Sequence, residues 1–203
     1  MASLAIRPVY ADDYQMARRL VATAFAGEPF ARGMFGESAL ARFAGLASDY
    51  AEWPSAPNPV LIGAEAAGHL VGIALATLPG ECALCDGFDQ SKTTVDTEAE
   101  RIEHEFQLAC RHSHVTNKLP PHAHIGPVAT DPTLHGTGVG RLLMSALADR
   151  LRAKEVECVV LECSTSRAAF YEHCGFKRVH EFDDPGGPGL RAVLMRAGLR
   201  NSE

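Results

Sequence analysis

The sequence predicts a mixed α/β fold, organised as a single domain over residues 1–203. Amphipathic segments of helical period alternate with short apolar runs, and the C-terminal half follows the order strand, helix, strand, helix, strand, strand. A chain of this length can bury one sizeable core. The composition, 46% hydrophobic and 22% charged residues, is that of an ordinary globular protein.

The N-terminal part is expected to begin with a strand over Leu4–Val9, followed by a helix from about Asp12, whose carboxylate would cap it. A second helix is expected over Ser38–Trp53. The apolar residues expected on the buried faces are Met16, Leu20, Val21 and Ala24 in the first helix, and Leu40, Phe43, Leu46 and Tyr50 in the second. Two apolar runs, Pro59–Gly63 and His69–Leu78, flank a glycine-bearing turn and predict a hairpin.

The middle of the chain is expected to hold a loop and a helix. Gly80–Asp96 contains glycine and polar residues, which favours a loop. Thr97–Val115 is expected to be helical because Ile102, Phe106 and Cys110 recur at intervals of four. We find no internal repeat and no linker that would divide the chain.

The next strand is expected over His122–Thr130, and the glycine-rich turn after it leads into a strongly amphipathic helix. The apolar stripe of this helix consists of Val139, Leu142, Leu143, Ala146, Leu147 and Leu151. Glu157–Cys163 is a continuous apolar run, as expected of a buried parallel strand. A helix over Ser166–Cys174 and two strands, Phe176–Phe182 and Leu190–Arg196, complete the order.

The most informative spacing is the turn Gly136-Thr137-Gly138-Val139-Gly140 between a strand and a helix. Unpaired amides at the helix start, the helix dipole and the missing Cβ atoms suit this turn to a pyrophosphate, and Arg141 could add a charge-assisted contact. Two alternatives stay open. The glycines could serve only close helix packing, or the turn could belong to a nucleotide-binding oxidoreductase, although its third glycine comes one position early for the dinucleotide motif.

The segment Val128-Ala129-Thr130-Asp131-Pro132 before this turn, with His135 at its start, resembles the acyl-CoA motif of the GNAT acetyltransferases. That motif reads Gln/Arg-x-x-Gly-x-Gly/Ala, and His135 stands here in its first position. A second signature of the family, Tyr-x-x-x-Gly-Phe, matches Tyr171 to Phe176. Within the family, the chain resembles the puromycin N-acetyltransferase group over about 120–203 and, loosely, over 1–30.

The resemblance implies the GNAT acyl-CoA acyltransferase fold, a central twisted mixed sheet with a splayed parallel strand pair, flanked by helices. Gly126-Pro127 is expected to form a bulge in the splayed strand, because proline cannot donate to a central ladder. The implied co-substrate is acetyl-CoA. Its implied binding residues are Val128, Ala129 and Thr130 for the pantetheine arm, and His135, Gly136, Thr137, Gly138, Val139, Gly140 and Arg141 for the pyrophosphate. Ser164 stands where many members have an Asn that binds the arm, so a rearranged contact is expected there.

Acetyl transfer to an amine needs a base for the amine and an acid for the departing thiolate. Tyr171 matches the family's general acid, although it could instead be a packed aromatic residue at a helix end. His124 and Glu162 are the candidates for the base, and alternation places His122 on the same strand face as His124. Both histidines could also be ordinary polar residues at a strand entrance. Glu28 could contact a cationic substrate, but a solvated turn residue is the expected role.

We therefore expect an N-acetyltransferase that moves acetyl from acetyl-CoA to an amine, of a small molecule rather than a protein, by direct attack in a ternary complex. The alternative is a catalytically silent acyl-CoA-binding module. The net charge of −6 argues against nucleic acid as a partner, and no segment predicts a signal peptide or a membrane helix. A cytoplasmic protein is expected, and a homodimer is implied only by its frequency in the family.

The cysteines are expected to be free thiols in a reducing compartment. Cys82-x-x-Cys85 is half of a zinc motif. The residues that follow it and could complete a site are His104, Cys110, His112 and His114. A second cysteine pair at the usual spacing is absent, so no metal is expected.

Overall fold

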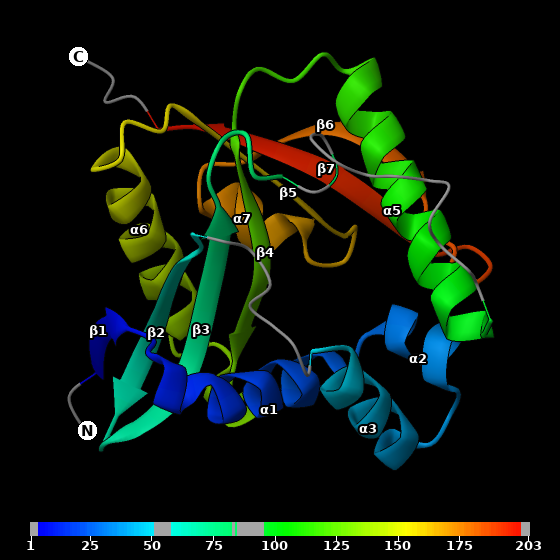
Figure 1. The fold of residues 1–203 in the computed structure, drawn as a ribbon, viewed down its shortest axis with the longest axis horizontal. Coiled ribbons are helices and arrows are strands. Elements are labelled where there is room, and N and C mark those ends of the chain that lie inside the picture. Colours follow the sequence, from blue (N-terminus) through cyan, green and yellow to red (C-terminus); the bar gives the residue numbers. More distant parts are fainter. Residues whose placement is uncertain (1–3, 51–57, 83, 85–95, 200–203) are drawn as a thin grey trace.

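The computed structural model describes residues 4–50, 58–82, 84 and 96–199, and its strands form one seven-stranded sheet (Figure 1). The strands are β1 (Leu4–Pro8), β2 (Val60–Ala66), β3 (His69–Thr77), β4 (Ala123–Thr130), β5 (Cys158–Ser164), β6 (Lys177–Asp183) and β7 (Arg191–Gly198). Their order across the sheet is β1-β2-β3-β4-β5-β7-β6. Among these strands β4 and β5 run parallel, and the other neighbours are antiparallel. The predicted mixed α/β fold is confirmed.

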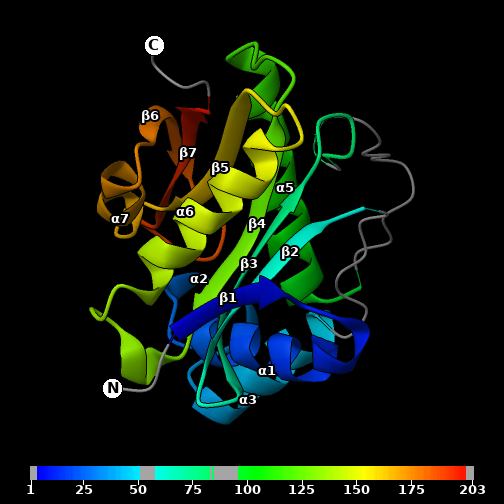
Figure 2. The same cartoon turned by 90° about the vertical axis from the view of Figure 1, so that its left-hand side faces the viewer.

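Helices cover both faces of the sheet (Figures 1 and 2). They are α1 (Tyr14–Phe25), α2 (Pro29–Phe35), α3 (Ala39–Asp49), α5 (Glu98–Thr116), α6 (Val139–Arg152) and α7 (Ala168–His173), with 3-10 turns over Ala11–Asp13 and Pro132–Leu134. One face of β3 packs through Ala74 on α6, and the opposite face packs through Ile73 on α1. α5 contacts β6 and β7.

The sequence analysis missed α2 and expected only a turn around Glu28. Pro29 occupies the first turn of this short helix, where the N–H that proline lacks would have no acceptor in any case. Trp53, the expected end of the second helix, lies outside the described residues, as does most of the expected loop Gly80–Asp96.

Three residues expected on buried helix faces are exposed instead. They are Met16 in α1, Leu40 in α3 and Leu142 in α6, with exposed fractions of 52%, 77% and 39%. Two nearby residues on the same helices, Ala17 and Met144, are buried in the core. An apolar helix stripe is more than about 100° wide. Periodicity alone therefore does not decide which residue at the edge of the stripe is covered.

The starts of α5 and α1 differ in how their backbone N–H groups are capped. At the start of α5, the Thr97 hydroxyl accepts from the Glu100 N–H at 3.2 Å, and the Glu100 carboxylate accepts from the Thr97 N–H at 2.7 Å. The expectation that the Asp12 carboxylate caps the first helix is wrong. Asp12 lies in the 3-10 turn before α1, and Asp13, the N-cap residue of α1, makes no side-chain capping hydrogen bond to the helix. The Asp13 carboxylate instead accepts from the Tyr10 N–H, at the start of the 3-10 turn, at 3.0 Å.

Asp13 also belongs to an ion-pair network that ties the first helix to the sheet edge. Arg7 donates from Nη1 to Asp13 at 2.7 Å and from Nε to Glu65 at 2.6 Å. The Arg7 and Asp13 side chains are 28% and 22% exposed. The hydrogen bonds from Arg7 and from the Tyr10 N–H lower the pKa of Asp13 from its ordinary 3.8 to about 2.

We expect the substitution Asp13→Asn to lower the free energy of unfolding by about 1–2 kcal/mol at pH 7. Because the pKa of Asp13 is lower in the folded than in the unfolded chain, the carboxylate's contribution is complete above about pH 4 and is lost as the pH falls toward 2. Denaturant unfolding of both proteins across this range measures the difference, which should shrink toward zero in acid. Asp12→Asn, at an exposed neighbour, is the control. A difference that stays constant with pH would contradict the assignment.

β4 carries the bulge predicted at Gly126 and Pro127. These two residues lie opposite one residue of β3, Leu75, because the register between the two strands shifts there. β4 pairs with β5 only at Ala123 and His124. Beyond His124 the parallel strands diverge, so the predicted splayed pair is also confirmed.

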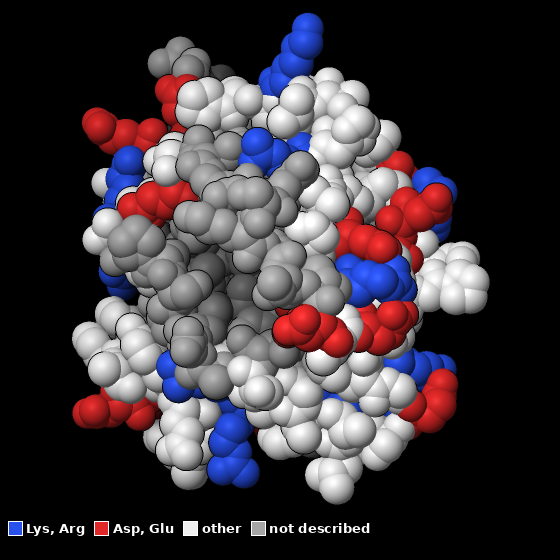
Figure 3. Space-filling model, turned by 45° about the vertical axis from the view of Figure 1, so that its right-hand side comes forward, with Lys and Arg blue, Asp and Glu red and all other residues white. Residues whose placement is uncertain are grey.

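The surface shown in Figure 3 carries charges of both signs side by side. On α5, for example, Arg101 pairs with Glu98 and Glu105, both at 2.6 Å. Basic side chains of the described residues form no continuous stripe on this face. None of the described helices is both long enough and apolar enough to cross a bilayer.

Candidate active site

The gap between β4 and β5 exposes backbone groups of β4. The Asp131 N–H donates to the Val71 carbonyl at 2.8 Å. Because hydrogen-bonded pairs alternate with non-bonded pairs in an antiparallel ladder, Ala129 also directs its backbone groups to β3, whereas Val128 and Thr130 direct theirs toward β5. Of the three amides expected to bind a pantetheine arm, that of Ala129 therefore faces away from the gap, which corrects the expectation for this residue.

The bulge also reverses which face of the sheet the side chains of β4 point to. Ala123 and Ile125, before the bulge, pack with α6, and so does Val128 after it. Ala129 packs with α1 on the opposite face. His124, which lies between Ala123 and Ile125, points to the face that carries α5.

The turn between β4 and α6 is open to solvent. Gly136 and Gly138 have φ angles of 78° and 92°, and a Cβ atom at either position would meet nothing within 4 Å. These glycines therefore serve the left-handed backbone rather than close packing. Gly140 differs, because a Cβ atom there would lie 3.1 Å from the Phe170 ring. The packing alternative thus describes Gly140 but not the other two glycines.

α6 begins at Val139, directly after this turn, and the N–H groups of its first residues are free for a ligand. The Leu142 N–H bonds back to the Gly138 carbonyl at 3.0 Å, so the N–H groups of Val139, Gly140 and Arg141 have no acceptor within the helix. The exposed residues of the turn are His135, Gly136, Thr137, Gly138 and Arg141. With the positive end of the helix dipole behind it, the turn suits an anion such as a diphosphate.

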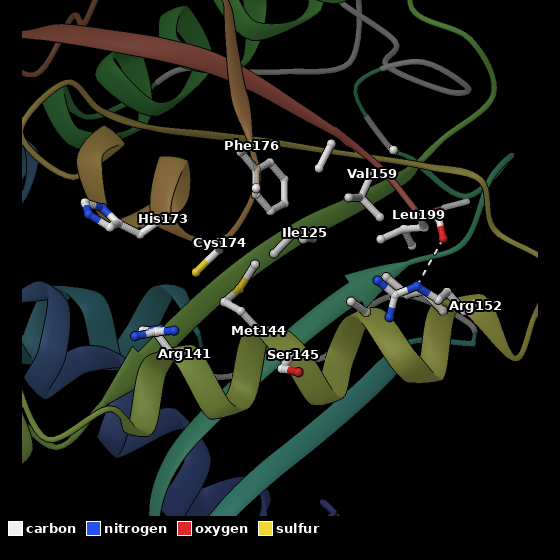
Figure 4. A pocket seen from close by; sticks show the side chains of 15 residues that line it. Ile125, Arg141, Met144, Ser145, Arg152, Val159, His173, Cys174, Phe176 and Leu199 are labelled. Atoms are coloured by element: carbon white, nitrogen blue, oxygen red, sulfur yellow. Dashed lines mark hydrogen bonds between the residues drawn. The ribbon is translucent and has the colours of Figure 1, made fainter. Parts of the chain in front are cut away.

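A cavity of about 430 Å³ runs along α6 from this turn (Figure 4). Arg141 stands at the end near the turn, and Arg152 stands at the far end. Ile125, Met144 and Phe176 give the cavity an apolar wall between them. Its lining therefore combines an apolar wall with a guanidinium group at each end.

Tyr171 lies on α7 next to the glycine turn. Its ring packs on Phe170 and Phe176, with centroid distances of 4.9 and 5.9 Å, and Phe170 is the ring that closes on Gly140. The side chain is half-buried, and its hydroxyl makes no hydrogen bond with the described part of the chain. Burial raises the pKa of Tyr171 above its ordinary value of 10, at which a phenol already keeps its proton at neutral pH.

Glu162 of β5 joins two histidines on the opposite face of the sheet. Its two carboxylate oxygens lie 2.5 Å from His114 Nε2 and 2.7 Å from His124 Nε2. The Glu162 and His114 side chains are 5% and 2% exposed, whereas His124 is 20% exposed. Burial alone would raise the pKa of Glu162, but the charge of His124 and the hydrogen bonds from both histidines lower it to about 2. Because Glu162 is ionised, both Nε2 atoms must donate to it.

His122 and His124 share His114 as a neighbour, with ring centroids 5.2 and 5.8 Å from it, so they lie on one face as predicted. His122 Nδ1 lies 2.7 Å from the Pro120 carbonyl, and burial lowers the pKa of His122. His114 was not predicted to belong to the active site. Its burial could have been predicted, because His114 continues the buried stripe of α5 at the same interval of four.

Glu28 and Ser164 both have polar partners. Arg167 donates from Nε to Glu28 at 2.9 Å, and the Glu28 side chain is only 12% exposed. The expectation that Glu28 is a solvated turn residue is therefore wrong: the residue precedes α2 and its charge is neutralised. The Ser164 hydroxyl, at the end of β5, shares a hydrogen bond with the Ser166 hydroxyl at 2.8 Å.

Successive side chains of β5 separate the site into two halves. Cys163 packs in the cluster that contains α6 and Tyr171, whereas Glu162 points to α5. The glycine turn, the cavity and Tyr171 therefore lie on one face of the sheet. Glu162 and its histidines lie on the other face, and both halves border the gap where β4 and β5 diverge.

Comparisons with known proteins point to one family. The profile described as "Acetyltransferase (GNAT) family" matches residues 28–176. A segment of 58 residues is 40% identical to the glucosamine 6-phosphate N-acetyltransferase of Trypanosoma brucei brucei. It covers 29% of this chain and 39% of that protein, so the match spans about two-fifths of this relative's length.

Two solved structures illustrate the shared fold. The polyamine N-acetyltransferase of Drosophila melanogaster, which catalyses the formation of N-acetylagmatine, matches 97% of this chain and 100% of its own, with a TM-score of 0.69 and 18% identity. An aminoglycoside 6′-N-acetyltransferase complexed with coenzyme A matches 98% of this chain and 99% of its own, with a TM-score of 0.60 and 11% identity. At these identities the likeness is one of fold.

Proposed function

Because this chain belongs to the acetyltransferase (GNAT) family and is an acetyl-transferring enzyme, we propose that it moves acetyl from acetyl-CoA to the amine of a small molecule, in a ternary complex. The observation that carries this proposal is the arrangement around the β4–β5 gap. An open anion-binding turn and a protonated phenol border the gap on one face, and an ionised carboxylate with an imidazole borders it on the other.

Acetyl-CoA, as the co-substrate, supplies an acetyl group activated as a thioester. We assign its diphosphate to the free amides from Val139 to Arg141 and to the exposed turn before them, where no side chain needs to be displaced. The backbone groups of Val128 and Thr130 bind the amide-rich arm as an added strand would. The fold that this chain shares with an N-acetyltransferase complexed with coenzyme A supports this assignment.

His124 acts as the general base in this proposal. Its Nε2–H donates to Glu162, so Nδ1 carries the lone pair that accepts the proton of the attacking amine. Glu162 holds the ring in this tautomer and stabilises the imidazolium that forms. Tyr171 donates its proton to the sulfur as the carbon–sulfur bond breaks. The N–H of Val128, the first free amide after the bulge, polarises the thioester carbonyl.

The acceptor binds on the α5 face, beside the three residues His114, Glu162 and His124, which we call the His–Glu–His set. His124 is the most exposed of the three. A small amine is supported by the names of the similar proteins, which act on glucosamine 6-phosphate and on polyamines. A silent acyl-CoA-binding module would need the glycine turn but would have no use for a buried carboxylate that orients an imidazole at the gap.

The proposal is tested by incubating the protein with acetyl-CoA and a panel of small amines that includes spermidine, agmatine and glucosamine 6-phosphate, while thiol release is followed. We expect thiol release that depends on one class of amine. Gly138→Ala should raise the KM for acetyl-CoA about tenfold, because a side chain at this positive φ lets the turn relax in the free protein, and binding must then restore the left-handed backbone at a cost of about 1–2 kcal/mol. Gly68→Ala, at a φ of 79° in the β2–β3 turn, introduces the same strain at a position to which we assign no contact with acetyl-CoA, and it is the matched control. Binding of CoA with no turnover of any amine would contradict the proposal.

A further inference from the structure

Three buried side chains from separate segments, Cys82, His114 and His122, converge beside the His–Glu–His set. The Cys82 sulfur and one ring nitrogen from each histidine all lie within 4.8 Å of one another. The exposed fractions of the three residues are 2%, 3% and 6%. Cys82 follows β3, His114 lies in the last turn of α5, and His122 immediately precedes β4. Figure 1 shows the chain passing from the end of α5 through a loop into β4, and the ring centroids of His114 and His122 lie 5.2 Å apart.

The chemistry of these donors fits a zinc ion. One thiolate and two imidazoles are ligands that Zn²⁺ prefers, and a three-residue set leaves a fourth tetrahedral position for water or another group. In a tetrahedral site with Zn–S near 2.3 Å and Zn–N near 2.0 Å, a sulfur and a nitrogen lie about 3.5 Å apart, and two nitrogens lie about 3.3 Å apart. Donor atoms that lie within 4.8 Å of one another would have to approach by at most about 1.5 Å, which moves each side chain by less than about 1 Å.

The outer hydrogen bonds of the two histidines match those of metal-bound imidazoles. His122 donates from Nδ1 to the Pro120 carbonyl at 2.7 Å, which leaves Nε2 as the lone-pair atom. His114 donates from Nε2 to Glu162 at 2.5 Å, which leaves Nδ1. A carbonyl and a carboxylate are the partners that usually fix the tautomer of a metal-binding histidine.

A bound Zn²⁺ would hold the Cys82 sulfur as a thiolate, because a coordinating thiol is deprotonated, and its charge would make that thiolate stable in a buried place. The second cluster, His114 with His124 and Glu162, is a poorer site. Its nitrogen–oxygen distances of 2.5 and 2.7 Å are those of hydrogen bonds, with protons already between the atoms.

We propose that Cys82, His114 and His122 bind one Zn²⁺ ion, which ties the segment after β3 to α5 and to the start of β4. The sequence has no second cysteine pair at the usual spacing for zinc. In the tertiary structure, two histidines take the place of that pair. Of the other candidates, Cys110 and His112 do not belong to either cluster among the described residues.

The metal content of the purified full chain tests this proposal. The protein is stripped with chelator, given Zn²⁺, separated from free ion and analysed by mass spectrometry. We expect about one equivalent of zinc, and at least a tenfold weaker affinity in Cys82→Ser and in His122→Gln. Cys158→Ser, at a buried free thiol on β5, is the matched control and should bind as the unmodified chain does. Stoichiometric zinc in either site variant, or none in the unmodified chain, overturns the proposal.

A second readout guards against a variant that loses metal because it misfolds. Co²⁺ is added to the stripped, unmodified chain, and the near-ultraviolet spectrum is recorded. A thiolate-to-cobalt charge-transfer band is expected, together with a rise in the melting temperature on metal addition. Cobalt bound without that band would show that no thiolate is a ligand, and the proposal would fail.

Discussion

Replacing Tyr171 with phenylalanine is expected to lower kcat about 10²–10⁴-fold and to leave the affinity for acetyl-CoA nearly unchanged. The substitution removes the proton donor but keeps the ring that packs between Phe170 and Phe176. A phenol with an ordinary pKa of 10 carries its proton at neutral pH, and burial raises the pKa of Tyr171 further, so the proton is present when the thiolate departs. Steady-state kinetics and direct titration with acetyl-CoA measure the two effects separately.

Tyr10→Phe is the matched control for this change, because it deletes a hydroxyl from a tyrosine that is 62% exposed. It should keep the full rate. If Tyr171→Phe also turns over within a few-fold of the unmodified enzyme, Tyr171 is a packing residue and not the acid. A loss of acetyl-CoA affinity equal to the loss of rate would instead place the hydroxyl in binding.

We expect Glu162→Gln to lower kcat by about 10²–10⁴-fold as well. The carboxylate accepts hydrogen bonds from His114 and His124 at the same time. A glutamine amide has only one accepting end, so one imidazole faces an NH₂ group and must turn or change tautomer. If that imidazole is His124, its Nδ1 no longer presents a lone pair to the amine. The change also leaves a buried donor unpaired, so the melting temperature should fall.

Because part of this loss could come from unfolding, the kinetics are compared at a temperature where both proteins are folded. Glu105→Gln, on the exposed face of the helix that carries His114, is the control and should leave kcat unchanged. An unchanged kcat for Glu162→Gln, with only its stability reduced, would assign the His–Glu–His set to structure and would leave the amine without a base.

Much of this fold could be predicted because short, local sequence patterns determine its elements. The apolar run of β5, the glycine-bearing hairpin of β2 and β3 and the capped start of α5 each follow from a few neighbouring residues. Pro127 also predicted the bulge, since a proline in a central strand has no N–H to give. Each of these features is set by residues that are close together in the sequence and therefore also close together in space.

The side chains and amides that were assigned to the wrong face share one physical cause, which is that local spacing does not fix rotation about an element. Met16 and Leu142 have the right period but lie at the edge of the buried stripe. Ala129 was expected to face the gap between β4 and β5, but the alternation of the ladder turns its amide to β3.

By itself, the sequence determined the family, the order of the strands and of every described helix but α2, the glycine turn at the start of α6 and Tyr171 in its motif. Only the tertiary structure decided which side chains meet, because His114, His124 and Glu162 come from α5, β4 and β5. Their contact requires the sheet order, the parallel pairing and the packing of α5 all at once. Such long-range distances are set by the core as a whole, and no short stretch of sequence records them.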